Sequence, residues 1–146
     1  MRLSSLRATG LASTLALTVL FGCGYRHDSN AFFVENWSSE YEIVNSCEPT
    51  NHPRGGHMEV WIDPSGFAAF TAGEPLPDGS VLLKPQWDES SSCSDDPDLY
   101  TVMRAKTGNA WDWQTVGRKG DIEETNAGDC SSCHATCGES LMCTFP

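Results

Sequence analysis

Near its C-terminus the chain carries two cysteines and a histidine at a spacing that suits covalent haem attachment. Residues 130–134 read Cys-Ser-Ser-Cys-His, a complete C-x-x-C-H pentapeptide. In c-type attachment, two thiols add across the haem vinyl groups and the adjacent histidine binds iron from the proximal side. The motif therefore predicts a covalent haem c held by Cys130 and Cys133, with His134 as the proximal iron ligand.

Two other interpretations of the same region stay open. Cys130, Cys133, Cys137 and Cys143 are close enough in sequence to hold zinc or an iron–sulfur cluster. They could instead form a disulfide knot in which His134 has no role, as in a disulfide-rich lipoprotein without haem. The spacing lacks the paired C-x-x-C arrangement common at metal sites, and exported thiols tend to oxidise. The haem interpretation is therefore favoured.

The N-terminus has the pattern of an export signal. Arg2 and Arg7 precede an apolar run over residues 11–21, which is too short for a membrane span and suits a signal-peptide core. Residues 20–23 (Leu-Phe-Gly-Cys) resemble a bacterial lipobox, in which Cys23 would be lipidated. We therefore expect residues 1–22 to be a lipoprotein signal peptide. The expected location is periplasmic and lipid-anchored, with Gly24 favouring the outer membrane.

The chain is strongly acidic, with 9 Lys and Arg residues against 20 Asp and Glu residues and a formal net charge of −11. Removal of a leader that contains Arg2 and Arg7 would make it more acidic. Nucleic-acid binding requires a basic surface, so this class of function is excluded. A small uncharged ligand or a basic redox partner protein fits the charge better.

Seven cysteines are present, and three of them have the roles given above. The other four are Cys47, Cys93, Cys137 and Cys143, an even number in an oxidising compartment, so two disulfides are expected. Four cysteines allow three pairings. Proximity in sequence favours Cys47 with Cys93 and Cys137 with Cys143.

Between these ends, short elements alternate with turns. Strands are predicted over residues 59–62, 80–84, 99–106 and 111–116, and short helices over residues 31–43 and 65–72. Residues 24–56 are mostly polar and rich in turns, residues 88–98 form an acidic loop, and residues 117–129 are polar. The pattern predicts an α+β protein with an antiparallel β-sheet and short flanking helices.

The order of these segments resembles the cytochrome P460 family, which includes the cytochromes c′-β. The resemblance lies in VWIDPSGF (60–67), PDGSVLLK (77–84), a strand that ends near Lys106, Gly108-Asn109 followed by two tryptophans, and the C-terminal C-x-x-C-H. It covers residues 57–146, which we expect to be a haem c domain. Residues 23–56 match only loosely and are assigned to a tether and N-terminal segment.

The resemblance implies a fold and a ligand class. Family members have an antiparallel sheet with a haem attached near the C-terminus, usually as a homodimer. Members of the P460 type oxidise hydroxylamine and carry a covalent bond between a lysine and the haem ring. Members of the c′-β type lack that bond and bind nitric oxide. The expected function is therefore a membrane-anchored haem protein that handles small nitrogen species.

The lysine of the family lies in the strand after the turn, where this chain has Lys84. A neutral lysine amine can add to an oxidised porphyrin edge, whereas arginine would stay protonated. Strand alternation predicts that Lys84 shares a face with Ser80 and Leu82. The alternative is a solvent-facing lysine at the end of a strand, since Pro85 follows it.

The distal side departs from the family pattern. The strand that carries a distal carboxylate in P460-type members matches residues 99–104, where this chain has Tyr100 and Thr101 and no carboxylate. Tyr100 is the candidate distal residue, and Thr101 is a second hydroxyl that could bind a ligand. His57, beside Met58, is a further candidate. The missing carboxylate weakens the enzyme interpretation, because such a group would act as a general base.

A third function remains open, a low-spin electron-transfer cytochrome. Its candidate sixth ligands are Met58, Met103 and Met142, although core packing accounts better for all three. Trp111 and Trp113 lie on one strand face and are expected in the core or a dimer interface.

Overall fold

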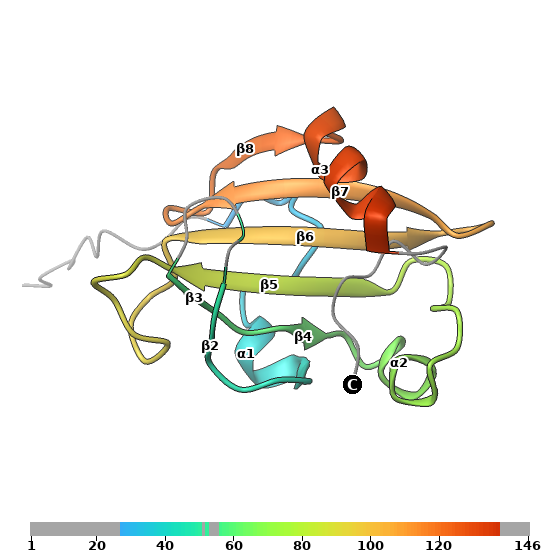
Figure 1. Ribbon diagram of the computed structural model, residues 1–146, viewed down its shortest axis with the longest axis horizontal. Helices are drawn as coiled ribbons and strands as arrows, with labels where there is room; N and C mark the ends of the chain where they lie inside the picture. Colours follow the sequence, from blue (N-terminus) through green and yellow to red (C-terminus); the bar gives the residue numbers. More distant parts are fainter. Residues whose placement is uncertain (1–26, 51, 53–55, 138–146) are drawn as a thin grey trace, which may run out of the picture.

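The computed structural model describes residues 27–50, 52 and 56–137, which form an antiparallel β-sheet with short helices against its two faces (Figure 1). This confirms the predicted α+β class. The expected signal peptide, Cys23, Met142 and Cys143 lie outside the described residues. Within the described segments, no helix combines the length and the hydropathy needed to cross a membrane.

Three long strands make the centre of the sheet, and shorter strands extend it on both sides. The long strands are β5 (Val81–Trp87), β6 (Leu99–Lys106) and β7 (Ala110–Gly117), with β8 (Ile122–Thr125) beside β7. The short strands on the β5 side are β1 (Glu42–Ile43), β2 (Glu48–Pro49), β3 (His57–Met58) and β4 (Trp61–Ile62). The helices are α1 (Trp37–Glu40), α2 (Phe67–Ala72), α3 (Gly128–His134) and the 3₁₀ turn η1 (Ala135–Cys137).

Pro85 lies inside a strand that is longer than predicted and beside a break between β3 and β4, of which only β4 falls within the predicted residues 59–62. β5 continues through Pro85 to Trp87, although the sequence predicted its end at Lys84. Proline has no N–H to donate to a neighbouring strand. The neighbouring strand is interrupted at this point: β3 pairs with the far end of β5, β4 pairs with its near end, and the Glu59 N–H donates to the Pro85 carbonyl at 3.2 Å.

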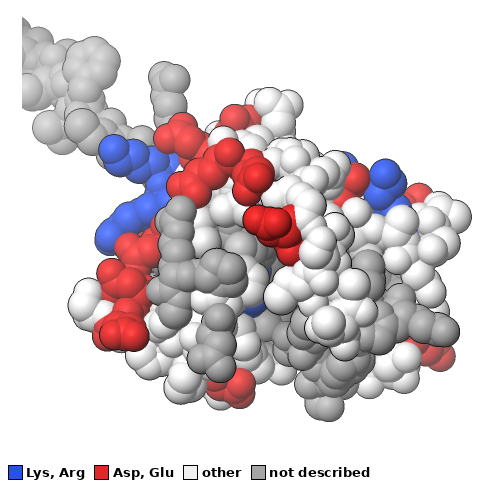
Figure 2. Space-filling view, turned by 45° about the horizontal axis from the view of Figure 1, so that its top comes forward, with Lys and Arg blue, Asp and Glu red and all other residues white. Residues whose placement is uncertain are grey.

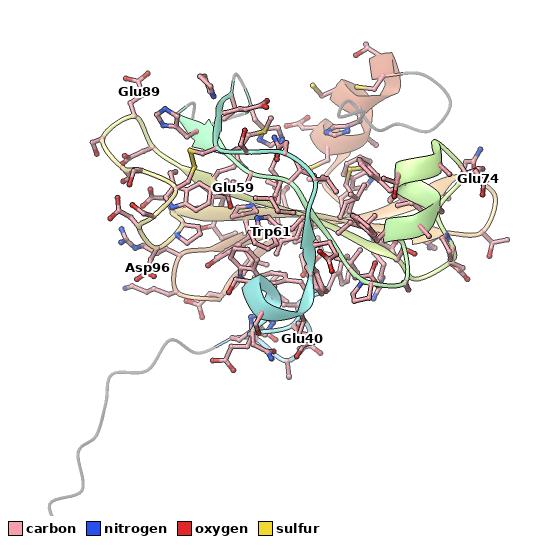
Figure 3. All side chains as sticks on the ribbon, turned by 90° about the horizontal axis from the view of Figure 1, so that it is seen from below. Glu40, Glu59, Trp61, Glu74, Glu89 and Asp96 are labelled. Carbon is pink, nitrogen blue, oxygen red and sulfur yellow. A yellow bond between two sulfur atoms is a disulfide. The ribbon has the colours of Figure 1, made fainter. Side chains whose placement is uncertain are left out.

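The two faces of the sheet have separate cores. One core contains Phe33, Leu83 and Tyr100 and is covered by residues 31–41, of which only α1 is helical although residues 31–43 were predicted as a helix. The other core is made by β4, β5 and α2, through Ile62, Leu82 and Phe70. Acidic side chains such as Glu40, Glu74, Glu89 and Asp96 lie at the periphery (Figure 3). The second face carries the candidate site described below.

The segment before the C-x-x-C-H motif contains more regular structure than its polar sequence predicts. Residues 117–129 contain β8, which pairs with β7, and the start of α3. One partly buried residue, Ile122, packs against the first core and accounts for the docking of this edge strand. β8 then returns the chain to the pocket face of the sheet.

Gly56 permits a close approach between the turn that begins β3 and the end of β5. It has φ +77°, and a Cβ there would lie 1.9 Å from the Trp87 carbonyl oxygen. Gly56→Ala is expected to lower the free energy of unfolding by about 3 kcal/mol, since the backbone must move as well as adopt a left-handed conformation. Gly79→Ala is the control: its φ is +90° but its Cβ would meet nothing within 4 Å. Urea denaturation of both variants measures the difference, and equal losses would contradict the steric argument.

Candidate functional site

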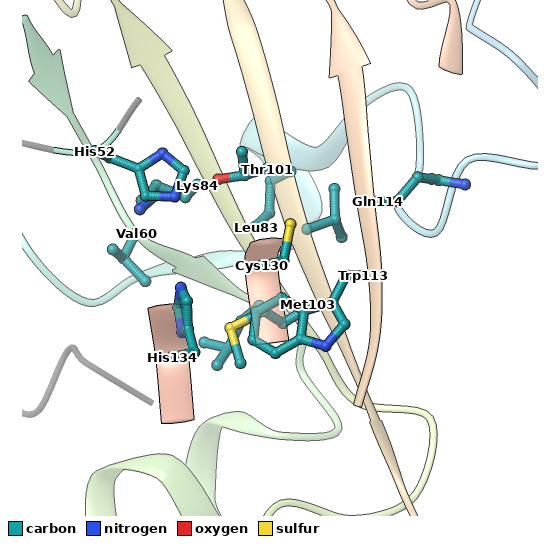
Figure 4. A pocket seen from close by; sticks show the side chains of 12 residues that line it. His52, Val60, Leu83, Lys84, Thr101, Met103, Trp113, Gln114, Cys130 and His134 are labelled. Atoms are coloured by element: carbon teal, nitrogen blue, oxygen red, sulfur yellow. The ribbon is translucent and has the colours of Figure 1, made fainter. Parts of the chain in front are cut away.

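A mostly apolar pocket lies between α3 and the sheet. The space between the lining side chains is about 590 Å³, a figure that includes the part open to solvent. Figure 2 shows a hollow on this side of the molecule with acidic residues above it, and Figure 4 shows the pocket from close by. The lining residues are His52, Val60, Leu82, Leu83, Lys84, Thr101, Val102, Met103, Trp113, Gln114, Cys130 and His134.

α3 places the motif at the pocket because a short clamp fixes the start of the helix. The Trp113 N–H donates to Oδ1 of Asn126 at 2.8 Å, and the Asn126 N–H donates to the Trp113 carbonyl at 2.7 Å. Asn126 adopts φ +53°, a left-handed conformation that asparagine tolerates better than most residues. Cys130, Cys133 and His134 then follow at helical spacings of three and four, which bring side chains to neighbouring positions on one face.

His134 reaches the pocket and contacts the sheet. Its ring centroid lies 4.6 Å from that of Trp113, with the rings at 62°. Trp113 is 6% exposed, so the imidazole contacts a buried side chain of the sheet. Trp113 therefore belongs to both the core and the pocket, while Trp111 packs against the second core. The histidine is oriented by this contact before any ligand enters.

Lys84 lies on the pocket wall together with Cys130 and His134 of the motif. Burial lowers the pKa of Lys84 from its ordinary value of 10.5 to about 8, and the nearby thiols of Cys133 and Cys130 partly oppose this effect. A lowered pKa increases the fraction of neutral amine, which is the nucleophilic form. The alternative of a solvent-facing lysine is wrong, because Lys84 is largely removed from solvent and lines the pocket.

The two motif cysteines are present as thiols. Cys130 lines the pocket, and burial together with Glu124 and Asp129 raises the pKa of its thiol. Cys133 is exposed, and it lies close enough to Lys84 to affect the pKa of that amine. The pair is not oxidised to a disulfide, so both sulfurs retain the chemistry that thioether formation needs.

A polar chain of side chains lies at the end of the pocket away from His134 (Figure 4). Nδ1 of His52 lies 3.1 Å from Oε1 of Gln86, and Nε2 of Gln86 donates to Oγ1 of Thr101 at 3.2 Å. Gln86 is 2% exposed, so its amide is held in place. His52 and Thr101 both line the pocket beside Lys84.

Tyr100 requires a correction. It was the candidate distal residue, but it lies on the opposite face of the sheet, with its ring centroid 5.1 Å from that of Phe33 in the first core. The cause is register: Lys84 is directly opposite Thr101, and Tyr100 is opposite Pro85. Successive side chains of a strand point to opposite faces, so Thr101 and Met103 line the pocket with Lys84.

A candidate distal residue, His57, and a candidate sixth ligand, Met58, both lie on β3. His57 pairs with Trp87 and Met58 with Gln86 at the end of β5, and neither lines the pocket. Met103 does line it, but Figure 4 shows Met103 at the same end as His134. The third methionine, Met142, lies outside the described residues.

His52 and Gln86 were not identified from the sequence. His52 lies in a turn-rich segment that has no periodicity to follow. Gln86 continues the alternation of Leu82 and Lys84, but Pro85 led to the expectation that the strand had already ended. Following the alternation past the proline would have placed Gln86 on the pocket face.

The disulfides bear on the metal interpretation. Cys47 and Cys93 form a disulfide, which is the pairing that sequence proximity favoured, and Cys137 is also in a disulfide. The sequence favoured Cys143 as the partner of Cys137, and Cys143 lies outside the described residues. A disulfide sulfur is not a thiolate ligand, so Cys137 cannot serve in a zinc or iron–sulfur site. In the described part of the chain, no group of three or more His, Cys, Asp and Glu side chains could hold a metal ion.

The lowered pKa of Lys84 makes the stability of the protein depend on pH. Below pH 8 the amine is protonated in both the folded and the unfolded state, so the full cost of burying it is present. Between about pH 8 and 10.5 the folded state binds fewer protons, and stability rises with pH. Lys84→Met is therefore expected to be more stable than the wild type at pH 7. Urea denaturation at pH 7 and pH 10 should show this advantage shrinking, and a pH-independent difference would contradict the burial of a charge.

Comparisons with protein-family models and with curated proteins found no match for this chain. The chemistry of the site must therefore be argued from the geometry of its own residues.

Proposed function

We propose that the protein is a membrane-anchored c-type haem protein of the cytochrome P460 type that oxidises hydroxylamine. One observation carries the proposal: Cys130, His134 and Lys84 line the same pocket. These are the attachment thiol, the proximal ligand and the amine that the resemblance assigns, and they come from two elements about fifty residues apart in the chain. An arrangement of this kind is not expected if C-x-x-C-H occurred by chance.

The residues present fit a covalent haem. Cys130 and Cys133 are thiols, His134 is held against Trp113, and the rest of the wall is mainly apolar, including Val60, Leu82 and Leu83. A haem needs only one protein ligand on its proximal side. When bound, the haem iron supplies one-electron redox chemistry and a position for a small ligand. The protein residues hold it, orient it and exclude water from it.

The charge around the pocket favours an uncharged substrate. Glu124 and Asp129 are close enough to Cys130 to raise the pKa of its thiol, and acidic residues lie above the hollow in Figure 2. A negative rim repels anions such as nitrite and admits neutral hydroxylamine. Two-electron oxidation converts NH₂OH to HNO and releases two protons and two electrons. A redox partner protein would accept the electrons, and a basic partner surface suits the net charge of −11.

Nitric oxide binding is the second candidate function. It is favoured by the lining of the pocket, which among the described residues includes no Asp or Glu. Electron transfer alone is less favoured, because Met103 lies at the His134 end of the pocket and is badly placed to be a ligand across from it (Figure 4).

The optical spectrum of the purified protein tests the proposal. In the oxidised and dithionite-reduced wild type we expect a strongly red-shifted reduced Soret band, produced by a bond between Lys84 and the haem ring. Lys84→Arg should show an ordinary haem c spectrum, since guanidinium stays protonated and cannot form the bond. Lys106→Arg is the control, because Lys106 is exposed and pairs with Asp112.

Each spectrum has a different meaning for function. An ordinary high-spin spectrum in the wild type that changes with nitric oxide would favour gas binding over hydroxylamine oxidation. A low-spin spectrum unchanged by ligand would favour electron transfer. The absence of haem absorbance would contradict the whole proposal.

A further inference from the structure

The polar end of the pocket brings His52, which the sequence did not single out, close to Thr101. His52 precedes β3 in the chain, and Thr101 lies on β6. Gln86 joins them from β5, with its Oε1 3.1 Å from Nδ1 of His52 and its Nε2 3.2 Å from Oγ1 of Thr101. Gln86 is 2% exposed, whereas His52 and Thr101 are partly buried, so the connection runs from the pocket wall through a buried amide.

The hydrogen bonds of Gln86 determine which nitrogen of His52 carries the proton. The amide nitrogen of Gln86 donates to Thr101, so the amide oxygen is the group that faces His52. An amide oxygen only accepts, so Nδ1 of His52 must be the protonated nitrogen. In the neutral ring Nε2 then carries the lone pair and is the basic nitrogen. Thr101 receives the Gln86 N–H on its oxygen, which leaves its own O–H able to donate.

The pocket thus places a base and a donor near each other at its polar end. Figure 4 shows His52, Lys84 and Thr101 together there, with Cys130 nearer the middle and His134 at the other end. Hydroxylamine has both a proton to give and a lone pair to share. A His52 acceptor and a Thr101 donor match these two properties, whereas nitric oxide has no proton to give.

We propose that His52 is the general base for hydroxylamine in this pocket and that Gln86 is its positioning residue. This inference rests on the proposed function. In the step, the O–H bond of hydroxylamine breaks, its proton moves to Nε2 of His52, and the electron pair stays on the oxygen. The imidazolium then returns the proton to solvent. His52 takes the role for which no carboxylate is available in β6.

The test compares haem-loaded, full-chain variants in a hydroxylamine oxidation assay with an artificial electron acceptor. His52→Gln is expected to lower kcat by about 100-fold with little change in KM, which is the usual size of a general-base contribution. His57→Gln is the matched control, a nearby histidine that does not line the pocket, and it should keep the wild-type kcat.

The positioning role of Gln86 has its own readout. Nitrogen-15 NMR of the reduced, carbon monoxide-bound protein, which is diamagnetic, should show His52 protonated on Nδ1. Gln86→Leu should lose this tautomer preference and lower kcat, and Gln86→Glu should restore both, because a carboxylate oxygen also accepts from Nδ1. An imidazole protonated on Nε2 in the wild type would overturn the assignment.

The outcomes separate the two proposals. A wild type that oxidises hydroxylamine, together with a His52→Gln variant of equal kcat, would overturn the role of His52 and leave the proposed function standing. A haem-loaded wild type that does not oxidise hydroxylamine would overturn the proposed function and the role of His52 with it.

Discussion

Replacement of Cys130 and Cys133 by serine is expected to abolish covalent haem attachment. A serine hydroxyl does not form the thioether bonds that two cysteine thiols make with haem vinyl groups. Haem staining of a denaturing gel should detect haem in the wild type and none in the double variant. Acidified organic solvent should extract any haem that remains bound without a covalent bond.

Ser131→Ala is the control within the same motif. The Ser131 hydroxyl donates to the Gly128 carbonyl at 3.0 Å on the exposed side of α3, so its loss should leave attachment intact. Covalent haem in the double serine variant would contradict the assignment of the C-x-x-C-H motif. A wild type without haem, from cells that mature other c-type cytochromes, would contradict the proposed function.

Removal of the Cys47–Cys93 disulfide is expected to be the largest single loss of stability. The bond joins residues 46 apart in the chain, and the chain-entropy relation gives about 4 kcal/mol for a loop of that size. This is a large part of the roughly 5–15 kcal/mol that stabilises a typical domain. Urea denaturation of Cys47→Ser/Cys93→Ser should therefore show a much lower midpoint than that of the wild type.

Ser94→Ala is the comparison for the disulfide variant. Ser94 is in the same exposed loop, where its hydroxyl is 2.7 Å from that of Ser92, and surface changes of this kind usually alter stability by less than about 0.5 kcal/mol. A disulfide variant as stable as Ser94→Ala would contradict the stabilisation expected from the chain-entropy relation. The bond also ties the loop after β5 to the segment beside β2, close to the turn that carries His52.

Local pattern was enough to predict the central strands. β6 lies over the predicted residues, and β5 and β7 begin within one residue of the predicted strands, because alternating apolar side chains fix both the strand and the face that it buries. The pattern was not enough for α3 and β8. Their sequence is polar, and their structure depends on pairing with β7 and on the Asn126 clamp.

The sequence by itself determined the chemistry that the motif could perform and the acidic character of the chain. The C-x-x-C-H motif indicates its own residues because covalent attachment of a haem requires them close together, and the resemblance to the cytochrome P460 family indicated Lys84. Only the tertiary structure decided which residues share the pocket with them. The register of β5 against β6 selects Thr101 and excludes Tyr100, and a turn distant in sequence brings His52 to Gln86. Register and turn packing arise from contacts between remote segments, which no local pattern records.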